Sequence, residues 1–166
     1  MQKPFAFFLS ALTLILAACS PNPNMQGYGE SYLQGEWQQD SIAVQKQLMN
    51  YSLYHFKFTC DSFFVQQQTY SKVNFGADTC MNSGHWTEYI RGTYNQRHDT
   101  LHLKGIFCNA DYTSKDPGGC FRSGMYEDFF KVNKKTDSLL QLTGTTSVIP
   151  VNLHLIKSLT CHIKPL

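Results

Sequence analysis

Hydrophobic and polar residues alternate with a period of two from Tyr54 onward. Tyr54, Phe56 and Phe58 fall on one face of the segment, and the polar residues between them fall on the other. A strand that buries one face and wets the other requires this alternation. The pattern therefore predicts a strand that begins at about Tyr54.

Further short segments with strand character follow along the chain. Leu101 and Leu103 alternate with His102, and Leu153 alternates with His154 in the same way. The predicted strands are Ser62–Tyr70, His85–Tyr94, Thr100–Phe107, Phe121–Asn133, Ser138–Thr143 and Val151–Lys157. Seven or eight strands joined by short polar turns are typical of an all-β antiparallel meander. Before them, Asp40 and Ser41 precede an apolar group at positions 42–49, which predicts one short helix capped by either residue.

Composition supports the sheet and argues against one class of partner. Aromatic residues make up 14% of the chain, and β-branched and aromatic side chains favour strands. The 14 basic and 12 acidic residues give a net charge of +2, with no block of like charge. Phosphate backbones are bound by clustered Lys and Arg, so we expect no nucleic-acid partner.

The N-terminal run has one early positive charge at Lys3, an apolar stretch and a small-residue exit at Leu16-Ala17-Ala18-Cys19. It is too short for a spanning helix and fits a secretory signal. The exit resembles the lipobox of bacterial lipoproteins, which implies cleavage before Cys19 and acylation of that residue. The alternative is an ordinary signal peptide, with Cys19 discarded or paired in a disulfide.

The lipoprotein resemblance implies a location. Two or three acyl chains hold a protein stably on a membrane. Ser20 stands where an inner-membrane sorting signal would have Asp, so the resemblance implies the outer membrane, facing the periplasm or the cell surface. The chain also resembles small outer-membrane lipoproteins of Bacteroidota-type bacteria. We expect residues 1–18 to be the signal, 19–30 a lipid-anchored tether rich in turn residues, and 31–166 one domain.

A meander of about eight strands removes its exposed edges only by closing into a barrel. Gly35-Glu36-Trp37, before these strands, resembles the Gly-x-Trp signature that opens lipocalins. The resemblance implies an up-and-down barrel in which Trp37 plugs the closed end and a basic residue, either Lys157 or Arg122, covers it. The alternative architecture is a β-sandwich, immunoglobulin-like or jelly-roll.

Five cysteines remain after Cys19, and thiols in an oxidising compartment usually pair. Cys108 and Cys120 flank the turn Asp116–Gly119, so we expect them to form a disulfide, with Cys60 and Cys80 as the second pair. Cys161 then stays single. The lipocalin resemblance implies another arrangement, in which Cys161 takes Cys60 and fastens the C-terminal tail to the barrel.

The residues with the strongest binding character are His85, Trp86, Glu88 and Tyr89, where a loop enters a strand. Mixtures of aromatic and polar side chains line small-molecule sites, so we predict a ligand site there, although Trp86 is also suited to the core. The loop 109–115 is a second candidate at the barrel rim. His85 and Glu88, with Asp61 or Asp78, are the one candidate acid–base set.

The expected function is ligand binding by a lipid-anchored monomer, with a small apolar or aromatic molecule in or at the mouth of the barrel. The alternatives are a non-enzymatic accessory protein of an outer-membrane complex and an extracytoplasmic enzyme of unknown reaction. Nucleophile and phosphate-loop motifs are absent from the sequence. His98 and His102 have no further ligands at suitable spacing, so we expect neither a metal nor a cofactor.

Overall fold

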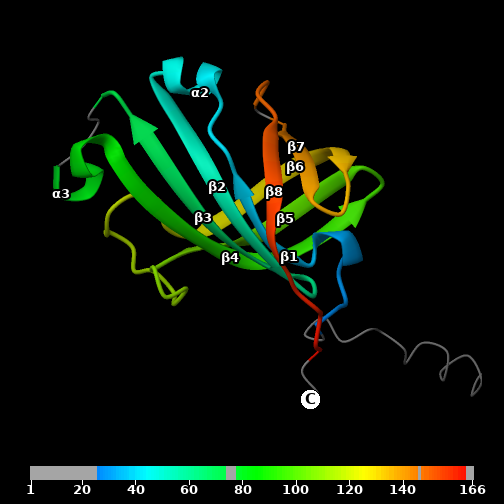
Figure 1. Ribbon diagram of the computed structural model, residues 1–166. Coiled ribbons are helices and arrows are strands. Elements are labelled where there is room, and N and C mark those ends of the chain that lie inside the picture. The colour runs from blue at the N-terminus through cyan, green and yellow to red at the C-terminus, as the bar shows by residue number, and fades with distance from the viewer. Residues whose placement is uncertain (1–25, 74–77, 146, 164–166) are drawn as a thin grey trace, which may run out of the picture.

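The chain forms a closed barrel of eight antiparallel strands, each paired with its neighbours in sequence, and β1 paired with β8. The computed structural model describes residues 26–73, 78–145 and 147–163, and Cys19 with the predicted signal lies outside them (Figure 1). The strands are β1 Gly35–Gln39, β2 Asn50–Thr59, β3 Ser62–Ser71, β4 His85–Arg97, β5 Thr100–Cys108, β6 Met125–Lys135, β7 Leu139–Gly144 and β8 Val151–Ser158. The up-and-down barrel is confirmed, and the sandwich alternative is wrong.

Short helices occupy two of the connections at one end of the barrel. The helices are α2 Ala43–Gln47 and α3 Asp78–Met81, and the 3₁₀ turns are η1 Ser31–Leu33 and η2 Asn82–Gly84. We call the end with α2 and α3 the mouth, and the end where the chain termini leave the barrel the base (Figure 1). The predicted capping of α2 is wrong: the helix starts after Ile42, whose backbone N–H donates to the Gln45 side chain at 3.2 Å.

Strand alternation matches the prediction over most of the barrel. β2 and β3 pair from Asn50↔Ser71 to Thr59↔Ser62 without a break. The prediction for β6 began too early, because Phe121 and Gly124 have φ values of 63° and 86°. These left-handed conformations interrupt an extended chain, so the strand starts only at Met125.

The base of the barrel is filled by apolar side chains. Trp37 is 1% exposed, and its indole N–H donates to the Leu33 carbonyl at 2.8 Å. One cation at this end, Lys135, lies with its Nζ 4.2 Å from the centroid of the Tyr32 ring. Lys157 instead pairs in register with Glu36 on an exposed surface. The core residues buried around Trp37 include Phe56, Phe58, Phe63, Leu101, Leu103, Phe130, Leu140, Leu142 and Leu153.

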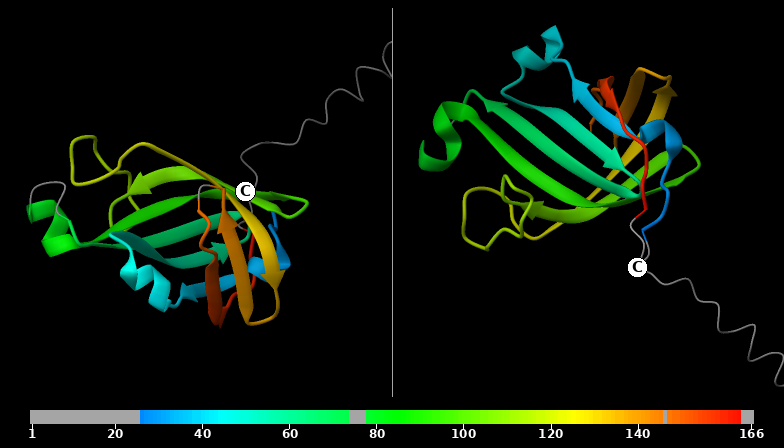
Figure 2. Two further views of the ribbon diagram at one scale, coloured as in Figure 1. Left: turned by 90° about the horizontal axis from the view of Figure 1, so that it is seen from above. Right: turned by 60° about the horizontal axis from the view of Figure 1, so that its bottom comes forward.

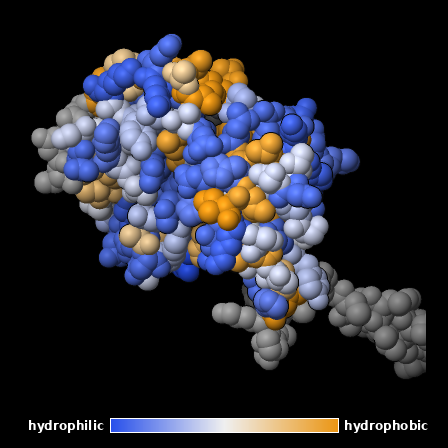
Figure 3. Space-filling view, in the orientation of Figure 1, coloured by the Kyte–Doolittle hydropathy of each residue, from blue (hydrophilic) through white to orange (hydrophobic). Residues whose placement is uncertain are grey.

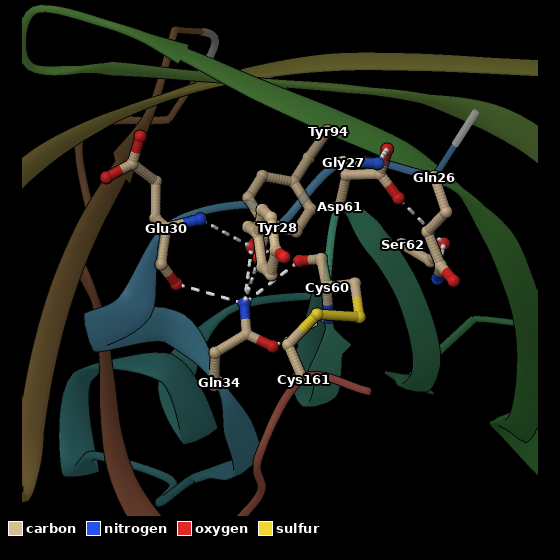
Figure 4. Close-up of a disulfide and its surroundings, with 10 residues drawn as sticks. All are labelled: Gln26, Gly27, Tyr28, Glu30, Gln34, Cys60, Asp61, Ser62, Tyr94 and Cys161. Atoms are coloured by element: carbon tan, nitrogen blue, oxygen red, sulfur yellow. Dashed lines mark hydrogen bonds between the residues drawn. A yellow bond between two sulfur atoms is a disulfide. The ribbon is translucent and has the colours of Figure 1, made fainter. Parts of the chain in front are cut away.

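A disulfide between Cys60 and Cys161 fastens the C-terminal tail to the base (Figure 4). The predicted Cys60–Cys80 pair is therefore wrong, and the pairing implied by the lipocalin resemblance is present. Gln34 Nε2 donates to the Cys60 carbonyl at 2.9 Å, and the Tyr94 hydroxyl donates to the same oxygen at 2.7 Å. Burial raises the pKa of Tyr94 to about 12.

The second disulfide joins Cys80 to Cys120 and ties two mouth loops together. The β5–β6 loop extends along the same side of the barrel as α3 in both views of Figure 2. The predicted Cys108–Cys120 pair is wrong because this loop carries Cys120 across to the β3–β4 connection instead of turning back on β5. Cys108 is a free, buried thiol that donates to the Ile106 carbonyl at 3.3 Å. Burial raises its pKa.

Candidate functional site

The interior of the barrel changes character from base to mouth. The base is packed with aromatic and aliphatic side chains. Toward the mouth, the same inward-facing positions of the strands carry polar groups, including Ser52, Gln67, Thr69, Glu88 and Asp128. Polar side chains that face a barrel interior lose hydration without contributing to the apolar core, so they mark the mouth as the candidate functional site.

A salt bridge between Glu88 and Arg122 is the main charged contact of the mouth. The Glu88 side chain on β4 is 6% exposed, whereas Arg122, from the β5–β6 loop, is 51% exposed. Arg122 Nη2 donates to Glu88 Oε2 at 2.6 Å and Nε donates to Oε1 at 3.0 Å. This two-point contact fixes the planar guanidinium, and its hydrogen bonds to Glu88 raise the pKa of Arg122 further.

Hydrogen bonds extend from Arg122 across two neighbouring strands. Arg122 Nη2 also donates to Gln67 Oε1 at 3.0 Å, and Gln67 Nε2 donates to the Ser52 hydroxyl at 3.1 Å. Ser52 and Thr69 share a further hydrogen bond of 2.9 Å between their hydroxyls. Below the guanidinium, the Phe107 ring centroid lies 4.6 Å from Arg122 Cζ. The β5–β6 loop is thus held over the mouth by charge, hydrogen bonding and ring contact together.

Beside this network lies a mouth cavity of about 220 Å³. Its lining includes Ser52, Tyr54, Asp128, Phe130, Gly144 and Val151. Drug-sized ligands occupy cavities of about 300–1,000 Å³, so this volume suits a smaller molecule. The Phe130 ring packs at 87° to the Phe56 ring of the core, with 6.2 Å between centroids, at the side of the cavity toward the packed base.

Asp128 is the charged side chain among the described residues that line the mouth cavity. Its Oδ1 accepts the Phe129 backbone N–H at 2.8 Å, and its Oδ2 accepts the Tyr126 hydroxyl at 3.4 Å. Burial raises the pKa of Asp128, although the charge on Arg122 acts in the opposite direction. Within residues 26–73, 78–145 and 147–163, no salt bridge involves Asp128.

The residues singled out from the sequence are divided between two sides of the barrel wall. His85 and Tyr89 lie on the outer side and line a side pocket of about 600 Å³ under the β5–β6 loop; Trp86 also borders this pocket but is in phase with Glu88 and opposite the inward-facing Thr69. Asn109, Ala110 and Lys115 of the second candidate stretch line the same pocket. Glu88 faces the interior instead, and Asp61 lies at the base, where it accepts the Gly27 N–H at 2.6 Å. Glu88 and Asp61 therefore do not join His85 in the predicted acid–base set.

Trp86 is engaged with the mouth loop rather than with the central core. Its ring stacks on Phe121 with 4.8 Å between centroids and 6° between planes. Phe121 immediately precedes Arg122 in the chain, so this stacking helps to place the guanidinium over the mouth. Sequence reasoning missed the roles of Arg122 and Asp128. The inward position of Asp128 could have been predicted from the sequence, because this residue alternates in phase with Tyr126 and Phe130 on one face of a predicted strand.

The surface of the mouth end carries exposed apolar side chains. Val44, Leu48 and Met49, in and just after α2, are 55%, 39% and 57% exposed. Figure 3 shows apolar residues among hydrophilic ones along the upper, mouth end of the molecule.

Within the described part of the chain, no helix is long and apolar enough to cross a membrane. No group of three or more His, Cys, Asp or Glu residues there could hold a metal ion.

Comparisons with known proteins give no match: no family model, curated protein or solved structure matches the chain.

Proposed function

We propose that this chain is a lipid-anchored envelope protein that binds a small aromatic ligand at the mouth of its barrel. The observation that carries the proposal is the mouth cavity, which lies above a packed apolar base. Tyr54 and Phe130 offer aromatic surface to a ligand, and Ser52 and Asp128 offer polar groups that can orient it. A small cavity with aromatic walls and a few directed polar groups is typical of small-molecule sites.

The anchor at Cys19 would hold the base of the barrel near the membrane. Gln26 Nε2 donates to Ser62 at 3.4 Å and Gly27 N donates to Asp61 at 2.6 Å, so the chain joins the barrel at its base. Seven residue steps separate Cys19 from Gln26, which is at most about 25 Å of extended chain. A lipid on Cys19 would therefore keep the base within this reach of the membrane and leave the mouth, at the opposite end, free to exchange a ligand with the aqueous phase.

The ligand proposal is tested on the chain that starts at Ser20. Every strand and both disulfides lie within residues 26–163, so this chain retains the complete barrel. Amide NMR during titration with 2-phenylethanol should show saturable shifts that centre on Ser52, Tyr54 and Phe130. A Gly144→Val variant should lose the binding, because a Cβ at Gly144 lies in ordinary contact, 3.7 Å from Phe130, and the added side chain fills the cavity.

The matched control is Thr143→Val, which places the same valine side chain at the neighbouring, outward-facing position of β7, where it replaces a hydroxyl that accepts from Asn133. It should bind 2-phenylethanol as the parent chain does. Shifts that are non-saturable, or that survive unchanged in a folded Gly144→Val protein, would contradict a ligand site at the mouth.

The anchor proposal is tested separately on the full chain. Expressed in a bacterium with lipoprotein processing, the chain should partition into the detergent phase and carry acyl groups on Cys19 by mass spectrometry. Cys19→Ala should abolish both. An unmodified Cys19 in the processed protein would overturn the anchor and leave the ligand proposal standing.

A second candidate function, an accessory protein of an envelope complex, rests on the exposed apolar side chains of Val44, Leu48 and Met49. Exposed apolar groups that lie together favour protein contacts. If this face binds a partner, Met49→Glu should release the full chain from a larger detergent-solubilised assembly while 2-phenylethanol binding by the barrel is unchanged. Migration of the parent chain as a monomer would exclude this candidate.

A further inference from the structure

The charge balance of the mouth leaves one carboxylate without a counterion. Among the residues that the structure describes, the interior of the mouth carries two acids, Glu88 and Asp128, and one cation, Arg122. Arg122 directs its Nε and Nη2 groups to both oxygens of Glu88 and to Gln67, and forms its salt bridge with Glu88. Among the described residues, Asp128 accepts hydrogen bonds from Tyr126 and Phe129 and forms no salt bridge. The described side chains of the mouth therefore carry a net negative charge.

The environment of Asp128 makes this charge costly in the empty protein. Its cross-strand partner is Leu103, which is 0% exposed. Tyr126 and Phe130 are its neighbours on the inward face of β6. An unpaired carboxylate in such surroundings loses hydration that a hydrogen bond from a hydroxyl replaces only in part. A positively charged group in the cavity would supply the missing partner.

The same cavity also offers aromatic surface to a cation. Tyr54 and Phe130 line it together with Asp128, and Tyr54 stacks on Phe56 with 5.5 Å between ring centroids. Rings attract cations through their negative faces, and the attraction grows as water is removed. An anionic ligand has no equivalent, because no Lys or Arg is among the described lining residues.

We infer that the mouth cavity selects a small aromatic amine, whose ammonium group pairs with Asp128 while its ring lies against Tyr54 and Phe130. The inference rests on the proposed function, because it names the chemical class of the ligand for the same cavity. The cavity volume of about 220 Å³ limits the ligand to a single ring with a short chain. The amine must be protonated, since its charge is what the site recognises.

The test compares three probes of similar shape and different charge: 2-phenylethylamine, 2-phenylethanol and 3-phenylpropionate. Dissociation constants are measured at pH 7 on the chain that starts at Ser20. We expect the amine to bind at least tenfold more tightly than the alcohol, and the carboxylate to bind more weakly than either. The amine should shift the amides of Asp128 and Phe129 as well as those of Tyr54 and Phe130.

Asp128→Asn should remove the preference for the amine and leave the alcohol affinity within about twofold. Asn retains an oxygen that can accept the Phe129 N–H, so the local backbone contact is preserved. The matched control is Glu127→Gln, which removes the same charge from the adjacent, outward-facing position beside His102. That variant should keep the tenfold preference, which separates a specific pairing from a general effect of net charge.

The outcomes separate the two proposals. If 2-phenylethanol binds in the cavity and the amine binds no better, or if Asp128→Asn and Glu127→Gln change the amine affinity equally, the cation inference is wrong and the ligand site stands. If none of the three probes binds, both proposals fail. If Asp128→Asn does not fold, Gly144→Val still decides whether the amine enters the cavity.

Discussion

Removing Arg122 should destabilise the barrel more than removing Glu88, although the two residues form one salt bridge. Glu88 is 6% exposed and Arg122 is 51% exposed, so the two charges have very different access to water. Arg122→Met keeps an unbranched stem over Phe107 but leaves the Glu88 carboxylate buried without its cation. Glu88→Gln leaves a cation that can turn toward solvent, and the glutamine oxygen can still accept its N–H groups.

The size of the asymmetry follows from burial. Removing one partner of a buried ion pair costs about 3–5 kcal/mol, whereas a solvent-exposed pair contributes about 0–1 kcal/mol. The Glu88–Arg122 pair lies between these limits, because water screens the exposed half of the arginine. We therefore expect Arg122→Met to lower the free energy of unfolding by about 2–3 kcal/mol, and Glu88→Gln to lower it by about 1 kcal/mol.

Urea unfolding with intact disulfides, followed by tryptophan emission, measures both values. The double variant completes a thermodynamic cycle. Because it no longer contains a buried unpaired carboxylate, it should be more stable than Arg122→Met alone. An arginine variant no less stable than the glutamate variant, or a double variant no more stable than Arg122→Met, would refute the view that Glu88 is the desolvated partner.

Three further predictions concern the base and the mouth. Cys161→Ser opens the bridge to Cys60 across 101 residues, and loss of such a loop closure should cost up to about 4.7 kcal/mol in urea unfolding. Gly29→Ala should unfold at lower urea than Gly118→Ala: both glycines have positive φ, but an added Cβ meets the Cys60 carbonyl at 2.0 Å at Gly29 and nothing within 4 Å at Gly118. Because burial raises the pKa of Asp128, the native state holds its proton to higher pH than the unfolded chain, so stability should fall as pH rises through that pKa. Asp128→Asn should remove this component from a pH series of unfolding curves.

The alternation of side chains along the sequence predicted the strands, and edge closure together with the Gly-x-Trp resemblance favoured a barrel over a sandwich. In the strands that contain Phe56, Leu101 and Leu153, every second side chain points inward. This period leaves a strand little freedom of register once one face is buried. The turn residues set the number of strands in the same local way. Strand ends were less predictable, because the positive φ at Phe121 depends on the loop around it.

Only the tertiary structure decided which distant residues meet. The sequence suggested Cys108 with Cys120 from their proximity along the chain, but disulfides depend on where the Cα atoms lie, and Cys80 and Cys120 approach to 5.2 Å. The same holds for the mouth, where Glu88 and Arg122 are 34 residues apart. Local patterns specify each strand and its buried face, whereas loop paths are set by contacts between loops, and these paths determine the disulfides and the charges at the mouth.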